Sequence, residues 1–183
     1  MPKVFLFMMI SLDGYFEGKD HDLSWHNVDA EFNDFAAEQL HDVGGLIFGR
    51  RTYELMADYW PAQKDEPDQV ATIMNQTRKL VVSRSLSSAD WHNTKVVRDD
   101  IPEALNGLRQ LTGKDLAVLG SSNLCLTLLK LHLLDEVRVM VNPVVIGSGT
   151  TLFHGIEEKL ELRLTKNRQF ESGNILLTYA PKA

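Results

Sequence analysis

The chain has 183 residues, and its 19 Lys and Arg against 25 Asp and Glu leave a formal net charge of -6. A hydrophobic share of 44% and a charged share of 24% exclude a disordered chain and favour a single domain over residues 1–183. No cluster of Lys and Arg indicates a nucleic-acid partner, and no run approaches the roughly 20 apolar residues of a membrane helix. Neither nucleic acid nor a membrane is therefore an expected partner.

The sequence holds one cysteine, Cys125, which excludes an intrachain disulfide and a cysteine-based metal site within one chain. Its place on the apolar stripe of a predicted helix indicates a core thiol. The six histidines show no ligand spacing, so no metal is expected. The apolar run 4–10 is too short for a secretion signal and no cleavage site follows it, so it predicts a buried strand in a cytoplasmic protein.

Apolar runs predict strands, apolar residues at helical spacing predict helices, and through residue 133 the two kinds alternate. Gly44 and Gly45 are expected to end the first helix, and residues 61–68 to form a surface loop. The predicted strands and helices are strand 4–10, helix 29–43, strand 46–48, a helix from 53 to 57 or beyond, strands 80–82 and 95–97, helix 100–112, strand 116–119 and a helix to about 133.

The carboxyl-terminal part has a different pattern. A long apolar strand at 137–145 is followed by the Gly147-Ser148-Gly149 break, an alternating strand at 160–164 and a last strand at 175–179. Alternation of strands and helices predicts a parallel sheet covered on both faces, and the closing strands add an antiparallel hairpin. We therefore expect a three-layer α/β fold with a largely parallel mixed sheet.

Three predicted strands end in the same way, with small or hydroxyl residues before a helix or turn. Ligands of open α/β sheets bind outside the carboxyl ends of strands, where glycine admits a phosphate and helix amides donate to it. Arginines there can pair with phosphate oxygens. The alternative is that these residues only end strands and helices on the surface. The residues concerned are Gly49, Arg50, Arg51, Thr52, Ser83, Arg84, Ser85, Gly120, Ser121 and Ser122.

Four ordered segments carry a family resemblance: Ser11-Leu12-Asp13-Gly14, the run 49–54, Gly120-Ser121-Ser122 and the run 142–149. Their order and spacing over nearly the whole chain resemble the dihydrofolate reductase-like superfamily. Within it the chain is most similar to the carboxyl-terminal reductase domain of the bacterial riboflavin-biosynthesis deaminase–reductase. The chain departs from those reductases at Leu119, where they usually carry Glu, and it has no deaminase segment, so it resembles the stand-alone members.

The resemblance implies an NADPH-dependent reductase. By analogy, Thr52 contacts the pyrophosphate, Arg50 or Arg51 the 2′-phosphate, and Ser83, Arg84 and Ser85 border the adenosine, while Gly120, Ser121 and Ser122 cradle the pyrophosphate from the other side. The implied substrate is a small heteroaromatic molecule that accepts hydride at a C=N or ring-opened ribosylamino carbon, as in 5-amino-6-(5-phosphoribosylamino)uracil reductase. Dihydrofolate reduction and a nucleotide-binding module without turnover remain the alternatives.

Two carboxylates are candidate catalytic groups, Asp29 and Glu31, because an acid beside a C=N bond can supply a proton. Helical spacing puts Asp29 on the apolar side of its helix, and the family carries an acid there shortly after a Trp. The spacing does not choose between the two, and Asp29 as a helix cap is the alternative.

Five more residues are candidates for the substrate pocket: Asp13, Trp25, Trp60, Pro143 and Gly147. Their alternatives are a tight turn at Asp13, buried packing of the tryptophans and a bulge at the Pro–Gly segment. The resemblance to dimeric relatives implies a homodimer, and the leucine-rich run 126–134 is a candidate to be partly buried against the second subunit.

Overall fold

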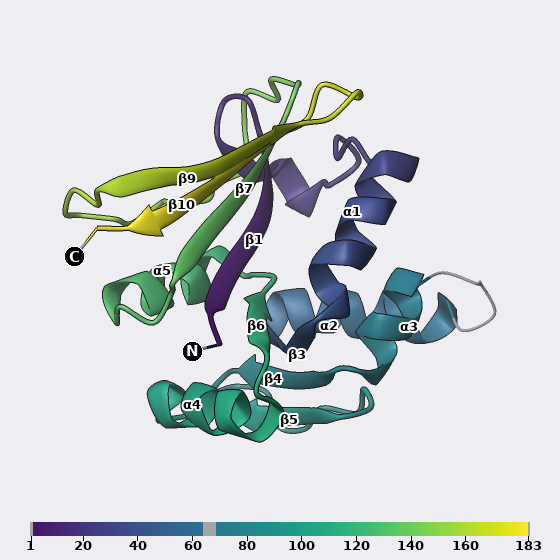
Figure 1. The fold of residues 1–183 in the computed structure, drawn as a ribbon, viewed down its shortest axis with the longest axis vertical. Coiled ribbons are helices and arrows are strands. Elements are labelled where there is room, and N and C mark those ends of the chain that lie inside the picture. Colours follow the sequence, from purple (N-terminus) through teal and green to yellow (C-terminus); the bar gives the residue numbers. More distant parts are fainter. Residues whose placement is uncertain (1, 64–68, 183) are drawn as a thin grey trace.

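An eight-stranded sheet organises the protein, with strand order β5-β4-β3-β6-β1-β7-β10-β9. The computed structural model describes residues 2–63 and 69–182 (Figure 1). The strands are β1 (Val4–Ser11), β2 (Tyr15–Glu17), β3 (Val43–Gly49), β4 (Arg78–Val82), β5 (Thr94–Val97), β6 (Asp115–Val118), β7 (Glu136–Asn142), β8 (Thr150–Thr151), β9 (Leu162–Gln169) and β10 (Ile175–Pro181). The helices are α1 (Ala30–His41), α2 (Arg50–Tyr59), α3 (Gln69–Gln76), α4 (Ile101–Thr112) and α5 (Ser122–Lys130), with the 3-10 turns η1 (Lys19–His21) and η2 (Trp60–Gln63).

The six strands from β5 to β7 pair in parallel, whereas β10 runs antiparallel to both β7 and β9. This is the predicted largely parallel sheet with a carboxyl-terminal antiparallel pair, so the expected fold class is confirmed. A separate two-stranded pairing joins β2 to β8. It links the loop after β1 to the loop after β7.

Helices cover both faces of the sheet, and the two larger of its three apolar clusters lie beneath them. One core joins α4 and α5 to one face through residues such as Leu108 and Leu128. The other joins α1, α2 and α3 to the opposite face through residues such as Leu40, Tyr53 and Met74 (Figure 1). Burial of apolar side chains on both faces explains why the inner strands are continuous apolar runs.

Gly44 and Gly45 were expected to end a helix, and this prediction is wrong, because both lie inside β3. A Cβ at Gly44 would lie 2.4 Å from Thr112 Oγ1, and one at Gly45 would lie 2.4 Å from Leu108 Cδ2. The two glycines therefore let α4 pack directly on the strand. The helix before them ends at His41.

Other predicted boundaries of strands and helices also differ from those of the structure. Strand β7 ends at Asn142 instead of continuing to residue 145, and the helix α3 was not predicted. In the expected surface loop 61–68, residues 61–63 belong to η2, and 64–68 lie outside the described residues. The predicted half-buried strand near 160–164 begins at Leu162 and is mostly exposed, because β9 is an edge strand.

The leucine-rich run after residue 125 packs within its own chain. Leu126, Leu128, Leu129 and Leu134 are buried, and Leu131 is exposed at 47%. The chain's own core therefore accounts for most of this run without a second subunit. Cys125 is fully buried beside them, and burial raises its pKa to about 12, which confirms the prediction of a core thiol.

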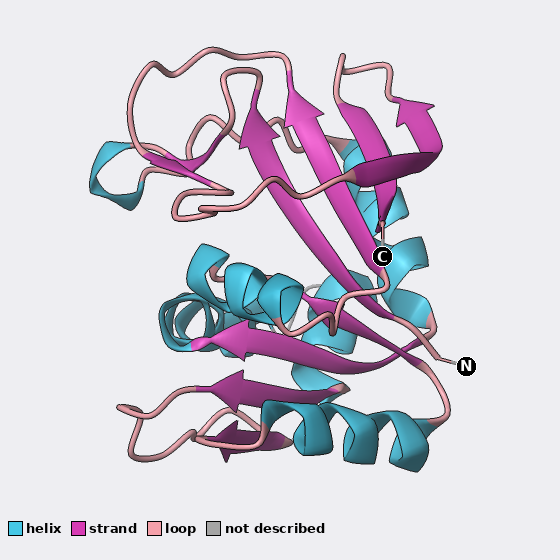
Figure 2. Cartoon of the chain, turned by 90° about the vertical axis from the view of Figure 1, so that its left-hand side faces the viewer, coloured by secondary structure: helices cyan, strands magenta, loops and turns pink. Residues whose placement is uncertain are grey.

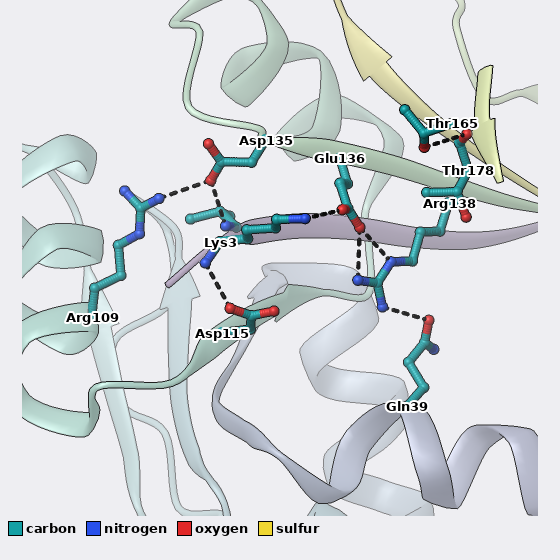
Figure 3. Close-up of polar contacts among 10 residues, drawn as sticks. Lys3, Gln39, Arg109, Asp115, Asp135, Glu136, Arg138, Thr165 and Thr178 are labelled. Atoms are coloured by element: carbon teal, nitrogen blue, oxygen red, sulfur yellow. Dashed lines mark hydrogen bonds and ion pairs between the residues drawn. The ribbon is translucent and has the colours of Figure 1, made fainter. Parts of the chain in front are cut away.

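Polar side chains at the amino ends of β1, β6 and β7 pair with one another (Figure 3). Asp115 accepts from the Lys3 amide at 2.7 Å, and Lys3 Nζ pairs with Glu136. Glu136 also accepts from Arg138 at 2.7 Å, and Asp135 accepts from the Val4 amide at 2.7 Å. These groups satisfy each other, so this edge serves to fasten β1 between its two neighbours.

Among the described residues, no helix is both long and apolar enough to cross a membrane. No three His, Cys, Asp or Glu side chains in that part of the chain are grouped so as to hold a metal ion.

Candidate functional site

The predicted site segments lie along one edge of the sheet. The carboxyl ends of β4, β3, β6, β1 and β7 are neighbours in that order, and each is followed by one of the segments that the sequence singles out. Figure 2 shows the arrowheads of the lower strands toward the left and those of the two long upper strands toward the top, because the sheet twists. Residues as far apart in the sequence as Asp13 and Gly147 are thereby brought to one surface.

The connections change direction between β3 and β6, which are adjacent strands. From β3 the chain passes through α2 on one face, and from β6 it passes through α5 on the other. In open α/β sheets such a reversal opens a crevice between the two loops, and ligands bind there. The topology therefore locates the candidate site at the first turns of α2 and α5.

The two turns are in direct contact at this point. The Gly49 amide donates to the Gly120 carbonyl at 2.8 Å. A Cβ at Gly49 would lie 2.6 Å from Ser121 Oγ, and one at Gly120, whose φ is +119°, would lie 2.8 Å from Thr52 Oγ1. Glycine is therefore required on both sides, because any side chain would push the two turns apart. The peptide bond between Gly120 and Ser121 is cis.

Helices α1, α2, α4 and α5 differ in how their amino ends are capped. Asp29 caps α1 by accepting from the Phe32 amide, and Asp100 caps α4 by accepting from the Glu103 amide. In contrast, Gly49 is the cap residue of α2 and Ser121 that of α5, and neither makes a side-chain cap hydrogen bond among the described residues. The first-turn amides of α2 and α5 remain free of side-chain caps and can donate to an anion.

The predicted phosphate-binding arginines surround this point without forming a tight cluster. Arg50 lies 3.5 Å from Glu54 on the same helix, and Arg84 lies 3.5 Å from Asp99. Both pairs are exposed, and such pairs are worth little. Arg51 instead donates to the ring of His21. The three guanidinium groups are therefore held by contacts that a phosphate can replace.

Ser83 follows β4 beside Gly49, since Val82 pairs with Gly49 in the sheet. Its hydroxyl accepts from the amides of Ser85 at 3.2 Å and Leu86 at 3.0 Å. Ser83 thus shapes the turn that borders the crevice. Ser122, in the first turn of α5, is buried at 4% exposure.

Asp13 lies in the turn after β1 and fastens the loop that follows β7. Its carboxylate accepts from the Gly147 amide at 2.8 Å and from the Ile146 amide at 3.2 Å. Hydrogen bonds from the Ser11 hydroxyl and from these amides hold the pKa of Asp13 below its ordinary value. Because the pKa of Asp13 is lowered in the folded state, this contact stabilises the protein at pH values above the ordinary titration range of Asp. That stabilisation is lost as pH falls through the lowered pKa.

The structure brings four of the five pocket candidates to one region. Asp13 holds Gly147, and the segment after Trp25 reaches β7 because the Asn27 amide donates to Asn142 Oδ1 at 2.8 Å. Pro143 directly follows Asn142. Trp25 itself donates to the Asp22 carbonyl and meets the His26 ring edge-on.

Trp60 does not join the other pocket candidates. It lies at the end of α2 away from Gly49, where its indole donates to Met56 Sδ at 3.1 Å. Its carbonyl accepts from Asn75, just before β4 begins, which is the amino edge of the sheet. Partly buried packing, the alternative weighed from the sequence, describes Trp60.

Both candidate catalytic carboxylates carry structural hydrogen bonds. Asp29 Oδ1 accepts from the Phe32 amide at 2.8 Å and caps α1. Glu31 accepts from Arg168 at 3.1 Å and from the Glu171 amide at 2.8 Å, so it ties α1 to β9 and the turn after it. The structure therefore places both at the start of α1, each engaged by its own chain.

The sequence patterns indicated no role for Asn142, although it lies in the family segment 142–149, and they did not single out Glu17 or His21. Asn142, fully buried, bonds the Asn27 amide and the carbonyls of Ile10 and Met140. Glu17 and His21 pair with each other and lie beside Arg51. No local pattern indicates a role for these residues, because their partners are distant in the sequence or outside any regular helix.

Comparisons with known proteins agree with this architecture. The profile of the RibD C-terminal domain family matches residues 2–176. The chain is 30% identical to YyaP of Bacillus subtilis (strain 168), described as an uncharacterized protein, over 97% of this chain and 94% of that one.

Solved structures share the fold. The putative riboflavin biosynthesis protein from Shewanella sp. PV-4 has a TM-score of 0.76 at 22% identity and is matched over 99% of both chains. RibD of Acinetobacter baumannii has a TM-score of 0.74 at 17% identity, and this chain spans only 58% of its length. With a family profile over nearly all its residues and a full-length relative at 30% identity, the chain belongs to the RibD C-terminal domain family.

Proposed function

We propose that the protein is an NADPH-dependent reductase. The observation that carries the proposal is the pair of helix starts without side-chain caps, at α2 and α5, which meet through Gly49 and Gly120 at the reversal between β3 and β6. Free amides at two adjacent helix starts suit a pyrophosphate, which carries negative charge on two linked phosphates. Membership of the RibD C-terminal domain family supports a reductase-like role.

The residues around the crevice fit such a cofactor. Thr52 and Ser121 flank the glycine contact and supply hydroxyl donors. Arg50 and Arg51 lie in the first turn of α2, and Arg84 follows β4, so their guanidinium groups suit the 2′-phosphate that distinguishes NADPH from NADH. Ser83, Ser85 and Ser122 would line the remaining boundary.

The reaction proposed is hydride transfer from bound NADPH to a C=N or ring-opened ribosylamino carbon of a small heteroaromatic substrate. Asp13, Pro143 and Gly147 would contact the substrate, and the Asp13 carboxylate holds the loop at Ile146 and Gly147 in place. Trp25 approaches the same region through the contact of Asn27 with Asn142. We further propose that residues 1–183 act as one reductase domain, in the cytoplasm and as a homodimer.

Thermal unfolding with and without nicotinamide cofactors tests the proposal. At a hundredfold excess over Kd, binding adds about 2.7 kcal/mol, which raises Tm by roughly 5–10 °C for a domain of this size. NADH should raise it less. Arg50→Gln should reduce the difference between the two cofactors, whereas the exposed Arg163→Gln on β9 should not. No shift with either cofactor at millimolar concentration would contradict the assignment.

A nucleotide-binding module without turnover is the second candidate, and one observation favours it. The carboxylates of Asp29 and Glu31 both accept hydrogen bonds from other parts of the fold. NADPH oxidation can be measured from the loss of NADPH absorbance, once with a ribosylaminopyrimidine phosphate and once with dihydrofolate. The two rates separate the two candidate functions and rank the two substrates. A chain that binds NADPH but oxidises it with neither substrate supports the module.

Asp29→Asn separates capping from proton supply. Asn caps helices as well as Asp does, so α1 and the NADPH affinity should be retained. If Asp29 also assists proton transfer, turnover should fall by about 100-fold, within the usual range for loss of a general acid. Equal turnover in Asp29→Asn and in the unchanged chain would leave Asp29 as a helix cap alone.

A further inference from the structure

A series of polar contacts joins the loop after β1 to the first turn of α2. His21, in η1, has its Nδ1 atom 3.0 Å from Glu17 Oε2, and its Nε2 atom accepts from the Arg51 guanidinium. Glu17 ends β2, so three separate elements meet at the imidazole ring. The ring joins the loop to the helix start where the proposed phosphates would lie.

The Glu17 end of this series is firmly held. Glu17 is 9% exposed, and its Oε1 atom accepts from the Thr150 hydroxyl at 2.9 Å. A Cβ at Gly149 would lie 2.0 Å from the Glu17 carbonyl oxygen, so the β8 segment packs against its backbone. His21 itself is held in a left-handed backbone conformation with a φ of 64°. The ring position is therefore set by β2, β8 and the η1 turn.

These contacts specify the protonation of the ring. A carboxylate only accepts, so the Nδ1 atom facing Glu17 carries the proton. A guanidinium only donates, so the Nε2 atom facing Arg51 must present its lone pair. The contacts thus fit a neutral imidazole in one tautomer.

A second proton on His21 would break one contact and keep the other. Protonated Nε2 would face the Arg51 guanidinium, donor against donor and cation against cation. The Glu17 carboxylate would still hold Nδ1 and would stabilise the charged ring. The charged groups that face the ring are Glu17 from β2 and Arg51 from α2, and Lys19, Asp20 and Asp22 adjoin it in the sequence.

We propose that His21 is a positioning residue for cofactor phosphate, acting through Arg51. The neutral ring ties Arg51 to the loop, and the protonated ring releases that guanidinium and adds a second cation toward the phosphate. NADPH affinity should then be higher at acid pH, where the ring carries its second proton. This inference rests on the proposed function, because it requires a dinucleotide phosphate at the start of α2.

The first test needs no cofactor. In NMR spectra of the His rings at a fixed pH, Arg51→Gln should move the His21 Nε2 resonance, because that nitrogen loses its donor. Glu17→Gln should move the His21 Nδ1 resonance, because that nitrogen loses its acceptor. His41, paired with Asp42 at the end of α1, is the internal reference and should keep its resonances in all three proteins. An unchanged His21 Nε2 resonance in Arg51→Gln would overturn the proposed contact whatever the protein binds.

The second test measures the Kd for NADPH between pH 5.5 and 8.5 in the unchanged chain, in His21→Asn and in His41→Asn. Asn tolerates the left-handed backbone and does not titrate in this range. Relative to His21→Asn, the unchanged protein should gain about tenfold in affinity toward acid pH, the scale of one charged hydrogen bond. Titration of the 2′-phosphate affects both chains and cancels in their ratio.

The outcomes distinguish the inference from the proposed function. Parallel pH curves for the unchanged chain and His21→Asn, with NADPH bound, overturn the inference and leave the function intact. Absence of NADPH binding at every pH overturns both. His41→Asn should follow the unchanged chain, and if His21→Asn does not fold, His21→Gln provides a second chain without the titrating ring.

Discussion

Gly49→Ala should weaken NADPH binding by at least about tenfold. The added Cβ would lie 2.6 Å from Ser121 Oγ and 3.1 Å from the Ser121 amide nitrogen, so the starts of α2 and α5 must separate. Gly49 has a φ of -76°, which alanine adopts without strain, so the effect is steric and local. Overpacking of this kind also costs about 1–3 kcal/mol of unfolding free energy. Fluorescence titration with NADPH and urea unfolding measure the two effects.

Gly107→Ala is the matched control. Gly107 lies within α4, and a Cβ there would meet nothing within 4 Å. Alanine in a helix interior should raise the free energy of unfolding by about 0.5–1 kcal/mol and leave NADPH binding unchanged. A Gly49→Ala chain that binds NADPH as tightly as Gly107→Ala would show that the glycine contact does not shape the cofactor site.

Asn142→Ala should lower the free energy of unfolding by about 3 kcal/mol. The Asn142 side chain is fully buried, accepts from the Asn27 amide at 2.8 Å and donates to the Ile10 carbonyl at 3.2 Å. Its removal leaves buried backbone groups without partners, and each such group costs about 1–3 kcal/mol. Urea unfolding measures the loss. Amide exchange should also accelerate at Asn27, because its amide loses the acceptor.

The control for this change is Asn167→Ala. Asn167 is exposed on the edge strand β9, so its replacement should alter the free energy of unfolding by less than about 0.5 kcal/mol. A loss at Asn142 as small as that at Asn167 would mean that water replaces the buried hydrogen bonds. In that case the Asn142 side chain would not be needed to hold the ends of β1 and β7 to the loop before α1.

Much of the fold could be predicted from the chain's local patterns. Inner strands such as β1 and β6 are continuous apolar runs because helices bury both of their faces. The start of the predicted helix 100–112 is confirmed, because Asp100 caps α4 through the Glu103 amide, a contact between residues close in sequence. The same locality let the strand ends at Gly49 and Gly120 be identified as candidate site segments.

Local patterns misled where a distant partner decided the structure. Gly44 and Gly45 resemble a helix stop, yet they lie in β3 because α4, more than 50 residues later, packs against them. Trp60 shares the aromatic character of Trp25, but α2 carries it to the opposite edge of the sheet. A single sequence does not tell which residues this far apart along the chain lie close together in space.

By itself, the sequence determined the fold class, the order of most strands and helices, and the segments proposed for the site, but it did not predict α3, β2 or β8. Periodicity and capping act over a few residues, so they can be recognised without knowing the path of the chain. Only the tertiary structure decided that α2 and α5 begin side by side on opposite faces, that Asp13 holds the loop at Gly147, and that His21 meets Arg51. Those contacts join residues far apart in the sequence, and they exist only once the strands have paired and brought their ends to one edge.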